Sequence, residues 1–212
     1  AHRLGLNAIK TELEDLYMRF TDKPIYESIV QKIDATKTVR NKFIKQFVAP
    51  VNGELEKLGI GFDIKGRPKS IHSIWNKMRK QNIPFEEVYD LFAIRIIIDT
   101  EYENEKAACW QVYSIVTDFY QPNPDRLRDW ISTSKANGYE SLHTTVMSST
   151  GQWVEVQIRT RRMDDIAEKG YAAHWKYKEG KGYDEKDVKR FAWLRQLLEW
   201  QQELQDSREF MD

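Results

Sequence analysis

The segment WVEVQIR, residues 153–159, decides the fold because its side chains alternate strictly between apolar and polar. Val154, Val156 and Ile158 would point to one face of an extended chain, and the polar residues between them to the other. This period-two alternation with β-branched residues predicts a half-buried β-strand. The polar face would carry a carboxylate, an amide and a guanidinium, each about 7 Å from the next. Such a row could hold a metal ion, orient a hydroxyl and bind a phosphate. A solvated face with one ion pair is the alternative.

The composition is that of a globular chain without an overall charge. Its 212 residues are 41% hydrophobic and 31% charged, which fits one large domain, or one domain with helical additions. The 33 basic and 33 acidic side chains cancel, so direct nucleic-acid binding is not expected and anion binding must come from local clusters. The single cysteine, Cys109, excludes an internal disulfide and suits a cytoplasmic location. No apolar run approaches the roughly 18 residues that a membrane span requires.

Helical spacing of apolar residues dominates the first quarter of the chain. It predicts helices over residues 6–20 and 24–47, and a short helix that follows Pro50 and Gly53. From residue 59 the pattern changes to a short strand and a turn, after which Lys69 or Ser70 would open another helix. The helices before residue 59 are interpreted as packing elements with solvated charges.

The rest of the chain alternates between strands and helices. Residues 89–99 are apolar on both faces, which is typical of a central strand. Further predicted elements are a helix at 103–119, a strand beginning at 126–131, a strand at 141–148 joined by a hairpin to 153–159, a helix after Thr160, and a last helix at 185–206. This order predicts an α+β fold: a mixed sheet with helices on one side and additional helices at both ends.

Cations gather where the helix after residue 69 is predicted to begin. Arg67, Lys69 and Ser73 lie there, and the backbone N–H groups of a helix N-terminus already favour an anion. A phosphate site is one interpretation, and a basic helix end without a ligand is the other. Seven cations in all lie near predicted strand or helix ends, which suits a reaction on polyphosphates; they are Arg67, Lys69, Lys77, Arg95, Arg126, Arg128 and Arg159.

Two carboxylates stand on or beside predicted strands. If the strands of Asp90 and Glu155 are neighbours, their side chains converge, and two carboxylates are enough for an Mg²⁺ ion that also binds phosphates and water. Arg95 lies inside an apolar strand, where a charge needs a partner or a purpose. Tyr139 follows a turn and is a candidate surface for stacking a base, although a tyrosine packed on the sheet is the alternative.

Five segments follow one another in the order seen in RelA/SpoT-type alarmone synthetases, and the chain resembles this family from about residue 59 to residue 178. The segments are GRPKSIHSIWNKM, YDLFAIRII, RLRDWIS, KANGYESLHTTV and VEVQIRT. By the same resemblance, residues 1–50 correspond to the end of the hydrolase domain and a linker, 51–180 to the synthetase domain and 181–212 to a following helix. The chain is therefore identified as a fragment of a long bifunctional member.

The resemblance implies a fold and a reaction. The fold is a nucleotidyltransferase-like, polymerase-β-like mixed sheet flanked by helices. The reaction is transfer of the β,γ-pyrophosphate of ATP to the 3′-hydroxyl of GDP or GTP, which releases AMP in the stringent response. The implied cofactor is Mg²⁺, with Mn²⁺ as the alternative. The implied partners of the full-length protein are a hydrolase domain and ribosome-contacting regulatory domains.

The resemblance also implies roles for single residues. Asp90 and Glu155 would be the catalytic and metal-binding acids, with Glu155 acting on the ribose hydroxyl. ATP would bind to Arg67, Lys69, Ser73, Lys77 and Arg95, with the two arginines on either side of adenine. The guanine nucleotide would bind to Arg128, Lys135, Asn137, Tyr139, His143, Gln157 and Arg159.

Two questions stay open at the level of sequence. Residues 126–129, RLRD, resemble the basic RxKD form of bifunctional members with Arg128 in place of lysine, which leaves the choice between GDP and GTP open because a guanidinium is a planar fork and an ammonium a point charge. A catalytically silent nucleotide-binding module is the alternative function, but such a relative would be expected to lack Asp90 or Glu155. A nucleotidyltransferase acting on RNA ends would need two acids one residue apart on a predicted strand, and none is found there.

Overall fold

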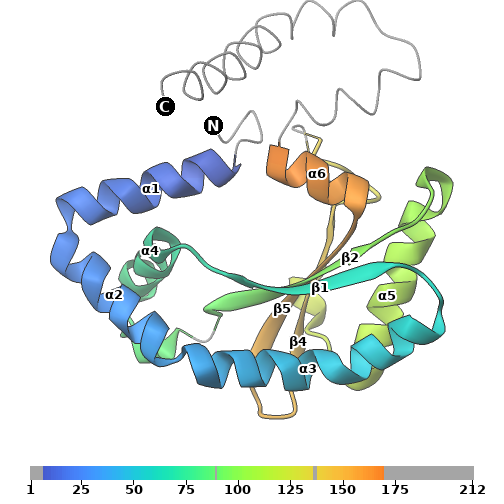
Figure 1. Ribbon diagram of the computed structural model, residues 1–212, viewed down its shortest axis with the longest axis horizontal. Helices are drawn as coiled ribbons and strands as arrows, with labels where there is room; N and C mark the ends of the chain where they lie inside the picture. The colour runs from blue at the N-terminus through green and yellow to red at the C-terminus, as the bar shows by residue number, and fades with distance from the viewer. Residues whose placement is uncertain (1–6, 89, 136–137, 170–212) are drawn as a thin grey trace, which may run out of the picture.

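A five-stranded mixed sheet forms the centre of the computed structural model, which describes residues 7–88, 90–135 and 138–169 (Figure 1). The strand order is β1-β2-β5-β4-β3. The strands are β1 Phe62–Pro68, β2 Phe92–Ile98, β3 Arg128–Asp129, β4 Leu142–Met147 and β5 Trp153–Thr160. β2 and β5 run parallel, and the other neighbouring pairs are antiparallel. The predicted mixed sheet is confirmed, as is the central position of the apolar strand β2.

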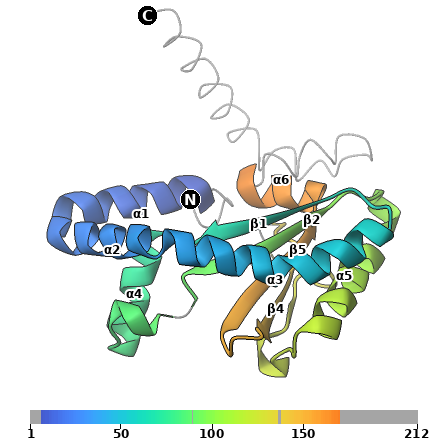
Figure 2. The same cartoon turned by 60° about the horizontal axis from the view of Figure 1, so that its bottom comes forward.

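Helices border both faces of the sheet. They are α1 Asn7–Thr21, α2 Lys23–Ala35, α3 Lys37–Lys57, α4 Ile71–Gln81, α5 Glu105–Phe119 and α6 Arg161–Lys169. α3 and α5 cover one face, while α6 lies on the opposite side of the sheet from α3, and α1, α2 and α4 pack on one another beyond one end of the sheet (Figures 1 and 2). The prediction of helices on one side therefore holds for α3 and α5 only.

The main core lies between the sheet and the two helices α3 and α5. The apolar face of β5 is buried there as its alternation predicts, and so are every second residue of β2 and of β4. The central members of this core are Phe47, Val51, Leu55, Ile94, Ile96, Ile98, Val112, Val116, Leu142, Val146, Val154, Val156 and Ile158. Burial of each such side chain contributes about 1.5–3 kcal/mol, so this layer fixes which face of every strand remains polar.

The helix predicted over residues 24–47 is wrong, because the chain breaks at Thr36. The Thr36 hydroxyl donates to the carbonyl oxygens of Lys32 and Ile33, at 3.0 and 3.1 Å. A threonine hydroxyl that bonds back to the preceding turn competes with the helical backbone pattern. No glycine or proline marks this break, so the apolar spacing on either side of it read as one helix.

Helix α3 continues through Pro50, where the sequence predicts a boundary. Proline has no N–H to donate to the carbonyl four residues earlier, which costs about 3 kcal/mol in a helix interior. Phe47, Val51 and Leu55 follow at four-residue spacing, and all three are buried against the sheet. Their burial outweighs the cost of the proline. The helix therefore also spans the expected division between a linker and a synthetase domain.

Strand β1 extends to Pro68 and so occupies the part of residues 59–70 in which the sequence predicts a turn. All seven of its residues pair with β2. Gly66 lies inside the strand, where a Cβ atom would approach the Cδ1 atom of Ile44 in α3 to 2.7 Å. Glycine in a strand commonly marks a close approach of this kind. It serves helix packing here, not a turn.

The strand predicted at 126–131 is limited to Arg128–Asp129. A short 3₁₀ helix, Pro124–Arg126, precedes it. The carboxylate of Asp129 accepts hydrogen bonds from the backbone N–H groups of Ile131 and Ser132, at 3.0 and 2.8 Å, and so ends the strand. The helix predicted after Thr160 is α6. Its predicted continuation and the predicted helix at 185–206 lie outside the described residues.

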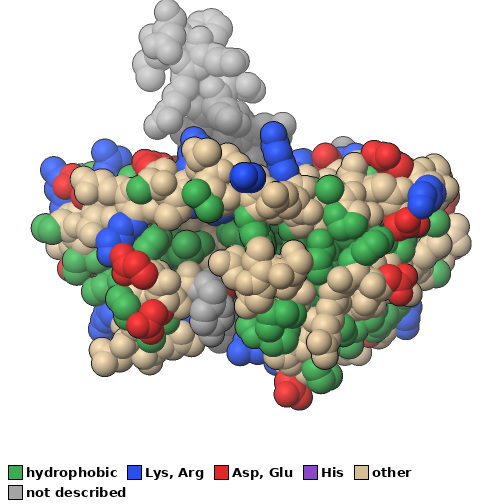
Figure 3. All heavy atoms as spheres, turned by 90° about the horizontal axis from the view of Figure 1, so that it is seen from below, with side chains coloured by type: hydrophobic (Ala, Val, Ile, Leu, Met, Phe, Trp, Pro, Cys, Tyr) green, Lys and Arg blue, Asp and Glu red, His purple; other side chains and the backbone are tan. Residues whose placement is uncertain are grey.

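Charge is dispersed on the face seen from below in Figure 3. Lysine and arginine side chains lie apart from one another on that face and form no single patch. In the described part of the chain, no helix is long and apolar enough to cross a membrane.

Candidate functional site

The five strands place one residue each in a single row across the sheet face opposite α3. Directly opposed residues on neighbouring strands share a face and approach to within about 5.5 Å. The row consists of Lys65 in β1, Arg95 in β2, Gln157 in β5, His143 in β4 and Arg128 in β3. The sheet order, which no local sequence pattern contains, thus makes neighbours of residues from four of the five family-like segments.

A second row lies two residues along the strands. It contains Arg67, Ala93, Glu155 and Thr145 in the same strand order. Ala93 is buried and carries only a methyl group, so it leaves room between the side chains of Arg67 and Glu155. The sequence analysis missed Ala93. Its signal was available, since it is the only small residue in the strand FAIRIII.

A cleft of about 1250 Å³ lies over the middle of these two rows and is lined by Arg95, Gln157 and His143 of the first and by Arg67, Ala93 and Glu155 of the second. Its walls come from the sheet, α1, α2, the start of α4 and α6. The cleft brings together most of the predicted site residues, namely Arg67, Lys69, Ser73, Lys77, Arg95, Lys135, Tyr139, His143, Glu155, Gln157 and Arg159. A second hollow of about 570 Å³ is lined by Asp90 and Arg126, and it shares Ser73, Lys77 and Glu155 with the cleft.

Lys69, Lys77 and Asp90 form the group that we call the lysine cluster. Asp90 precedes β2 and accepts hydrogen bonds from Lys69 on Oδ2 and from Lys77 on Oδ1, the latter at 2.5 Å. All three side chains are half-buried. Burial raises the pKa of Asp90, but the hydrogen bonds from both lysines outweigh it and hold the pKa below its ordinary value. Two ammonium groups against one carboxylate leave the cluster a formal charge of +1.

The start of α4 fixes this cluster. Ser70 is the residue that caps the helix, since its hydroxyl accepts a hydrogen bond from the backbone N–H of Ser73 at 3.2 Å. The cap sets the helix to begin at Ile71, so that Ser73 and Lys77 lie one turn apart on one side. The prediction that Lys69 or Ser70 opens this helix is confirmed for Ser70.

A chain of polar contacts runs from the loop to Glu155. The Tyr139 hydroxyl lies 2.8 Å from Nε2 of His143, and Nδ1 of His143 lies 3.5 Å from Oε1 of Glu155. Gln157 Nε2 donates to the same Oε1 atom at 2.8 Å. The hydrogen bond from His143, followed by that from Gln157, outweighs burial and lowers the pKa of Glu155 to about 2. Glu155 is therefore a carboxylate at neutral pH.

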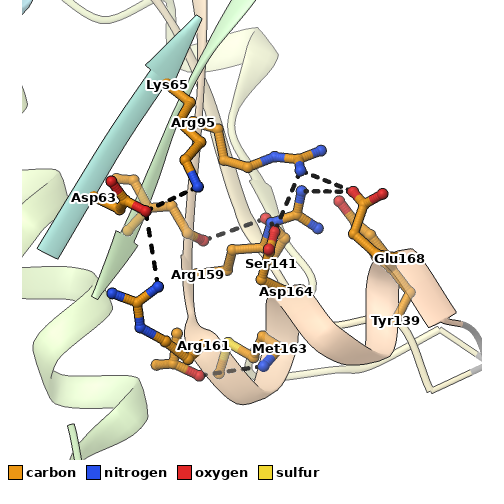
Figure 4. A network of polar contacts seen from close by, with 12 residues as sticks. Asp63, Lys65, Arg95, Tyr139, Ser141, Arg159, Arg161, Met163, Asp164 and Glu168 are labelled. Carbon is orange, nitrogen blue, oxygen red and sulfur yellow. Dashed lines mark hydrogen bonds and ion pairs between the residues drawn. The ribbon is translucent and has the colours of Figure 1, made fainter. Parts of the chain in front are cut away.

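Arg95, Arg159, Asp164 and Glu168 form the arginine cluster, in which the side chains of α6 meet those of the sheet (Figure 4). Nη1 of Arg95 donates to Asp164 Oδ1 at 3.3 Å and to Glu168 Oε1 at 2.8 Å. Nε of Arg159 lies 3.0 Å from Asp164 Oδ1. Arg159 is 1% exposed, and its burial, with Arg95 close by, lowers its pKa. Two guanidiniums against two carboxylates leave this cluster formally neutral.

The loop before β4 carries two aromatic rings around one cation. Nζ of Lys135 lies 4.6 Å from the ring centre of Trp130 and 5.0 Å from that of Tyr139. The backbone turns at Gly138, whose φ of +73° favours glycine. Asn137, which the sequence places at the guanine site, lies outside the described residues.

Arg128 is the described site residue that neither hollow contains. Its guanidinium donates instead to the backbone carbonyl oxygens of Asp125 and Leu127, at 2.9 and 2.8 Å. The neighbouring Arg126 lines the second hollow.

The sequence analysis also missed Asp164 and Glu168. Their four-residue spacing puts both on one side of a helix, which was an available signal.

The donor set fits a hard divalent cation that also binds phosphate. Asp90 and Glu155 line the same hollow, and Lys69 acts on both, as a partner of Asp90 and as one cause of the low pKa of Glu155. Among the described residues, no three histidine, cysteine or acidic side chains converge as a metal site. Mg²⁺ usually takes only one or two carboxylates and completes its shell with water and substrate phosphates. Asp90 would have to exchange an ammonium partner for the metal.

The chain belongs to the RelA/SpoT family. The family profile described as "Region found in RelA / SpoT proteins" matches residues 66–182, more than half of the chain, and confirms the predicted resemblance. The whole chain is 42% identical over 212 residues to a GTP pyrophosphokinase of Myxococcus xanthus, of which it covers 27%. It is 40% identical over 215 residues to the GTP pyrophosphokinase of Escherichia coli K12, of which it covers 28%.

A differently named relative and solved structures complete the comparison. A guanosine-3′,5′-bis(diphosphate) 3′-pyrophosphohydrolase of Aquifex aeolicus is 42% identical over 200 residues, with 94% of this chain and 28% of that protein covered. Small alarmone synthetase 2 of Bacillus subtilis is 20% identical with a TM-score of 0.42, over 90% of this chain and 98% of that one. Small alarmone synthetase 1, bound to pppGpp, is 21% identical with a TM-score of 0.40, over 79% of this chain and 97% of that one. The chain thus spans little more than a quarter of its curated relatives.

Proposed function

We propose that this chain carries the synthetase activity of its family, transfer of the β,γ-pyrophosphate of ATP to the 3′-hydroxyl of GDP or GTP with release of AMP. The observation that carries the proposal is that Lys69, Lys77 and Glu155 line one cleft, with Asp90 in the adjoining hollow. Two relatives at 40–42% identity that are named GTP pyrophosphokinases support it. A cation excess suits a polyphosphate, and an ionised carboxylate beside it suits a hydroxyl nucleophile. We also propose that the sheet is of the nucleotidyltransferase-like type.

The spacing of two arginines suits a purine between them. Arg67 and Arg95 lie on neighbouring strands, on one face, in the diagonal relation of residues i and j+2. Diagonal neighbours of this kind are about 7–8 Å apart. Two flat groups that each contact an aromatic ring at about 3.5–4.0 Å need the same separation. We therefore assign the adenine of ATP to the space between these guanidiniums.

The triphosphate of ATP would extend from there toward the lysine cluster. Lys69, Ser73 and Lys77 line the cleft. Lys69 precedes α4, and Ser73 and Lys77 lie in the first two turns of that helix. Phosphate oxygens are stronger partners for the ammonium groups than one shared carboxylate, because they carry more charge. Once its ammonium partners turn to phosphate, Asp90 is left to bind a metal together with Glu155. When bound there, Mg²⁺ would neutralise charge that develops on the phosphoryl oxygens.

The acceptor nucleotide would approach from the loop side. The ring of Tyr139 would stack on guanine, with Lys135 and His143 beside it, and Glu155 would receive the 3′-hydroxyl. A bond forms between O3′ and the β-phosphorus while the bond from that phosphorus to the α-phosphate oxygen breaks, so AMP leaves and the hydroxyl proton is released. With a pKa of about 2, Glu155 is a weak base, and we infer that it mainly orients the hydroxyl and shares the metal.

The experiment is a transfer assay with ATP labelled at the β-phosphate, GDP or GTP, and Mg²⁺. The expected products are AMP and a guanosine nucleotide that carries the label on its ribose 3′-oxygen, in equal amounts. Glu155→Gln should bind ATP nearly as the wild type does and form no product. Label found only in inorganic phosphate, or an active Glu155→Gln variant, would refute the assignment. ATP binding without any transfer would favour the silent nucleotide-binding module.

The partners of the whole protein remain part of this proposal. The chain covers 27–28% of these two relatives, so most of each of them lies outside the part that matches this chain. A hydrolase domain and ribosome-contacting regulatory domains are the partners that the family resemblance suggests. The cytoplasm is the proposed location, and Mg²⁺ or Mn²⁺ the proposed cofactor.

A further inference from the structure

The arginine cluster contains two acids that the proposed reaction does not use. Asp164 and Glu168 lie on the same side of α6, one turn apart, and both face guanidiniums of the sheet (Figure 4). Glu168 lines the cleft together with Arg95 and Arg159. A carboxylate in a cleft built for polyphosphates would repel its ligand, unless it acts on the protein's own cations.

The contacts show what these acids act on. One nitrogen of Arg95, Nη1, donates to both carboxylates, and one oxygen of Asp164 is shared between Arg95 and Arg159 at 3.3 and 3.0 Å. Hydrogen bonds from a guanidinium lie close to its plane, so they hold its edge and leave its flat faces open. A guanidinium held by its edge presents a face to a stacking ring.

The charges explain why two acids are needed. Arg159 is almost fully buried, and Arg95 lies close enough to it to help lower its pKa. With either acid neutralised, two adjacent guanidiniums would face one carboxylate and repel each other. Arg95 is the more exposed of the two, at 11% against 1%, so it is the one free to turn away from its present orientation.

We propose that Asp164 and Glu168 are positioning residues for the donor nucleotide, which hold the Arg95 guanidinium in the orientation that stacks on adenine. The proposal rests on the proposed function for the identity of the donor, but it concerns binding only. It makes α6 the element that sets the affinity for the base of ATP without touching the phosphates. The neutrality of the arginine cluster is then a requirement of the site, since a stacked purine brings no charge of its own.

The test compares two ligands of the chain by calorimetry, ATP and inorganic tripolyphosphate. In Asp164→Asn the dissociation constant for ATP should rise about five- to thirty-fold, the range of one lost cation–π contact, while that for tripolyphosphate stays within about twofold. Glu168→Gln should act in the same direction. It is the safer variant for folding because its side chain is 45% exposed. In an Arg95→Met background, Asp164→Asn should raise the dissociation constant for ATP by less than about a further twofold, because the guanidinium through which Asp164 acts is absent.

A matched control is a carboxylate outside the cleft that pairs with the same helix. Arg161 of α6 pairs with Asp99 at 2.5 Å, with both side chains about half exposed and neither in the cleft lining. Asp99→Asn should leave the affinities for both ligands unchanged. Equal weakening of ATP and tripolyphosphate by Asp164→Asn, no weakening, or tighter ATP binding would overturn the positioning role. A wild type that binds ATP without transferring pyrophosphate would instead reject the proposed reaction and leave this inference standing.

Discussion

The lysine cluster and the arginine cluster lie in neighbouring parts of one site, yet they differ in charge. In the lysine cluster two ammonium groups share the single carboxylate of Asp90. In the arginine cluster two guanidiniums meet two carboxylates from α6. The first has a cation in excess and, under the proposed function, would exchange its carboxylate for phosphate. The second is neutral, and the Arg95 guanidinium is held by its edge through the hydrogen bonds of Nη1.

The difference teaches that counting cations does not locate a phosphate site. The sequence analysis grouped seven lysines and arginines as phosphate donors, but the partners of each one separate them. Lys69 and Lys77 are half-buried around one shared anion, so a polyphosphate bound as proposed would gain two ammonium partners and release one carboxylate. To bind a phosphate through Nη1, Arg95 would have to lose its hydrogen bonds to two carboxylates, whereas stacking on a ring would preserve both.

The largest effect is expected from removing the carboxylate of the lysine cluster. Asp90→Asn should lower the rate of pyrophosphate transfer roughly 10²–10³-fold, because the developing phosphoryl charge loses a proposed metal ligand. ATP binding measured without a divalent ion should persist, since both lysines remain. Transfer rates near those of the wild type would show that Asp90 has no role in the reaction. They would also contradict the proposed exchange of its carboxylate for phosphate, which distinguishes the two clusters.

Exchanging one cation in each cluster separates their roles more finely. Lys77→Met should weaken ATP and tripolyphosphate alike, by about ten- to hundredfold for a lost charge-assisted hydrogen bond. Arg95→Met should weaken ATP and AMP by about five- to thirtyfold and leave tripolyphosphate unchanged. Titration calorimetry of both variants with the three ligands gives the comparison. The same ligand profile for both variants would show that the clusters are not specialised.

Changes in the loop should spare both clusters. Tyr139→Ala should weaken GDP by about 1–3 kcal/mol through lost stacking, whereas ATP binding stays the same. Tyr139→Phe keeps the ring and loses only the hydroxyl contact to His143, so its effect on GDP should be clearly smaller. Equilibrium binding of each nucleotide to both variants decides the matter. If Tyr139→Ala weakens ATP as much as GDP, the ring does not mark the acceptor side.

The smallest effect concerns the pH dependence of stability. Because the pKa of Glu155 is about 2 in the folded chain against an ordinary 4.5, its ionised form contributes about 3 kcal/mol above pH 4.5. This contribution is lost as the pH falls through the folded value. The difference in unfolding free energy between wild type and Glu155→Gln should therefore shrink by about 1 kcal/mol from about pH 5.5 to about pH 3.5. If urea titrations gave a difference in unfolding free energy that does not change with pH, they would contradict the stabilisation of the carboxylate by His143 and Gln157.

Local patterns were sufficient for much of the fold. The alternation in residues 153–159 correctly gave β5 and its buried face, and the apolar run around Ile96 gave the central strand. The errors arose where packing overrides local preference. Pro50 continues a helix because its neighbours are buried, and Gly66 lies in a strand because α3 passes close to it.

The residues of the site were easier to find than their partners. Motifs in the sequence pointed to Lys69, Lys77 and Arg95, but the pairing of each depends on the strand order and on the place of α6. The sequence analysis made no prediction for Asp164 and Glu168, because helical spacing shows that they share one side of a helix but not which residues they contact. Arg128 was assigned to the guanine site from its motif, and its contacts with its own turn follow only from the backbone of that turn.

Side-chain ¹⁵N NMR of the lysine and arginine groups tests the central claim most directly. Tripolyphosphate should shift the Nζ signals of Lys69 and Lys77 and leave Nε of Arg95 in place. AMP should shift Nε of Arg95 and leave the two lysines in place. Signals of both clusters that respond together to tripolyphosphate, or an Arg95 signal that ignores AMP, would contradict the division of the cleft into a phosphate end and a base end.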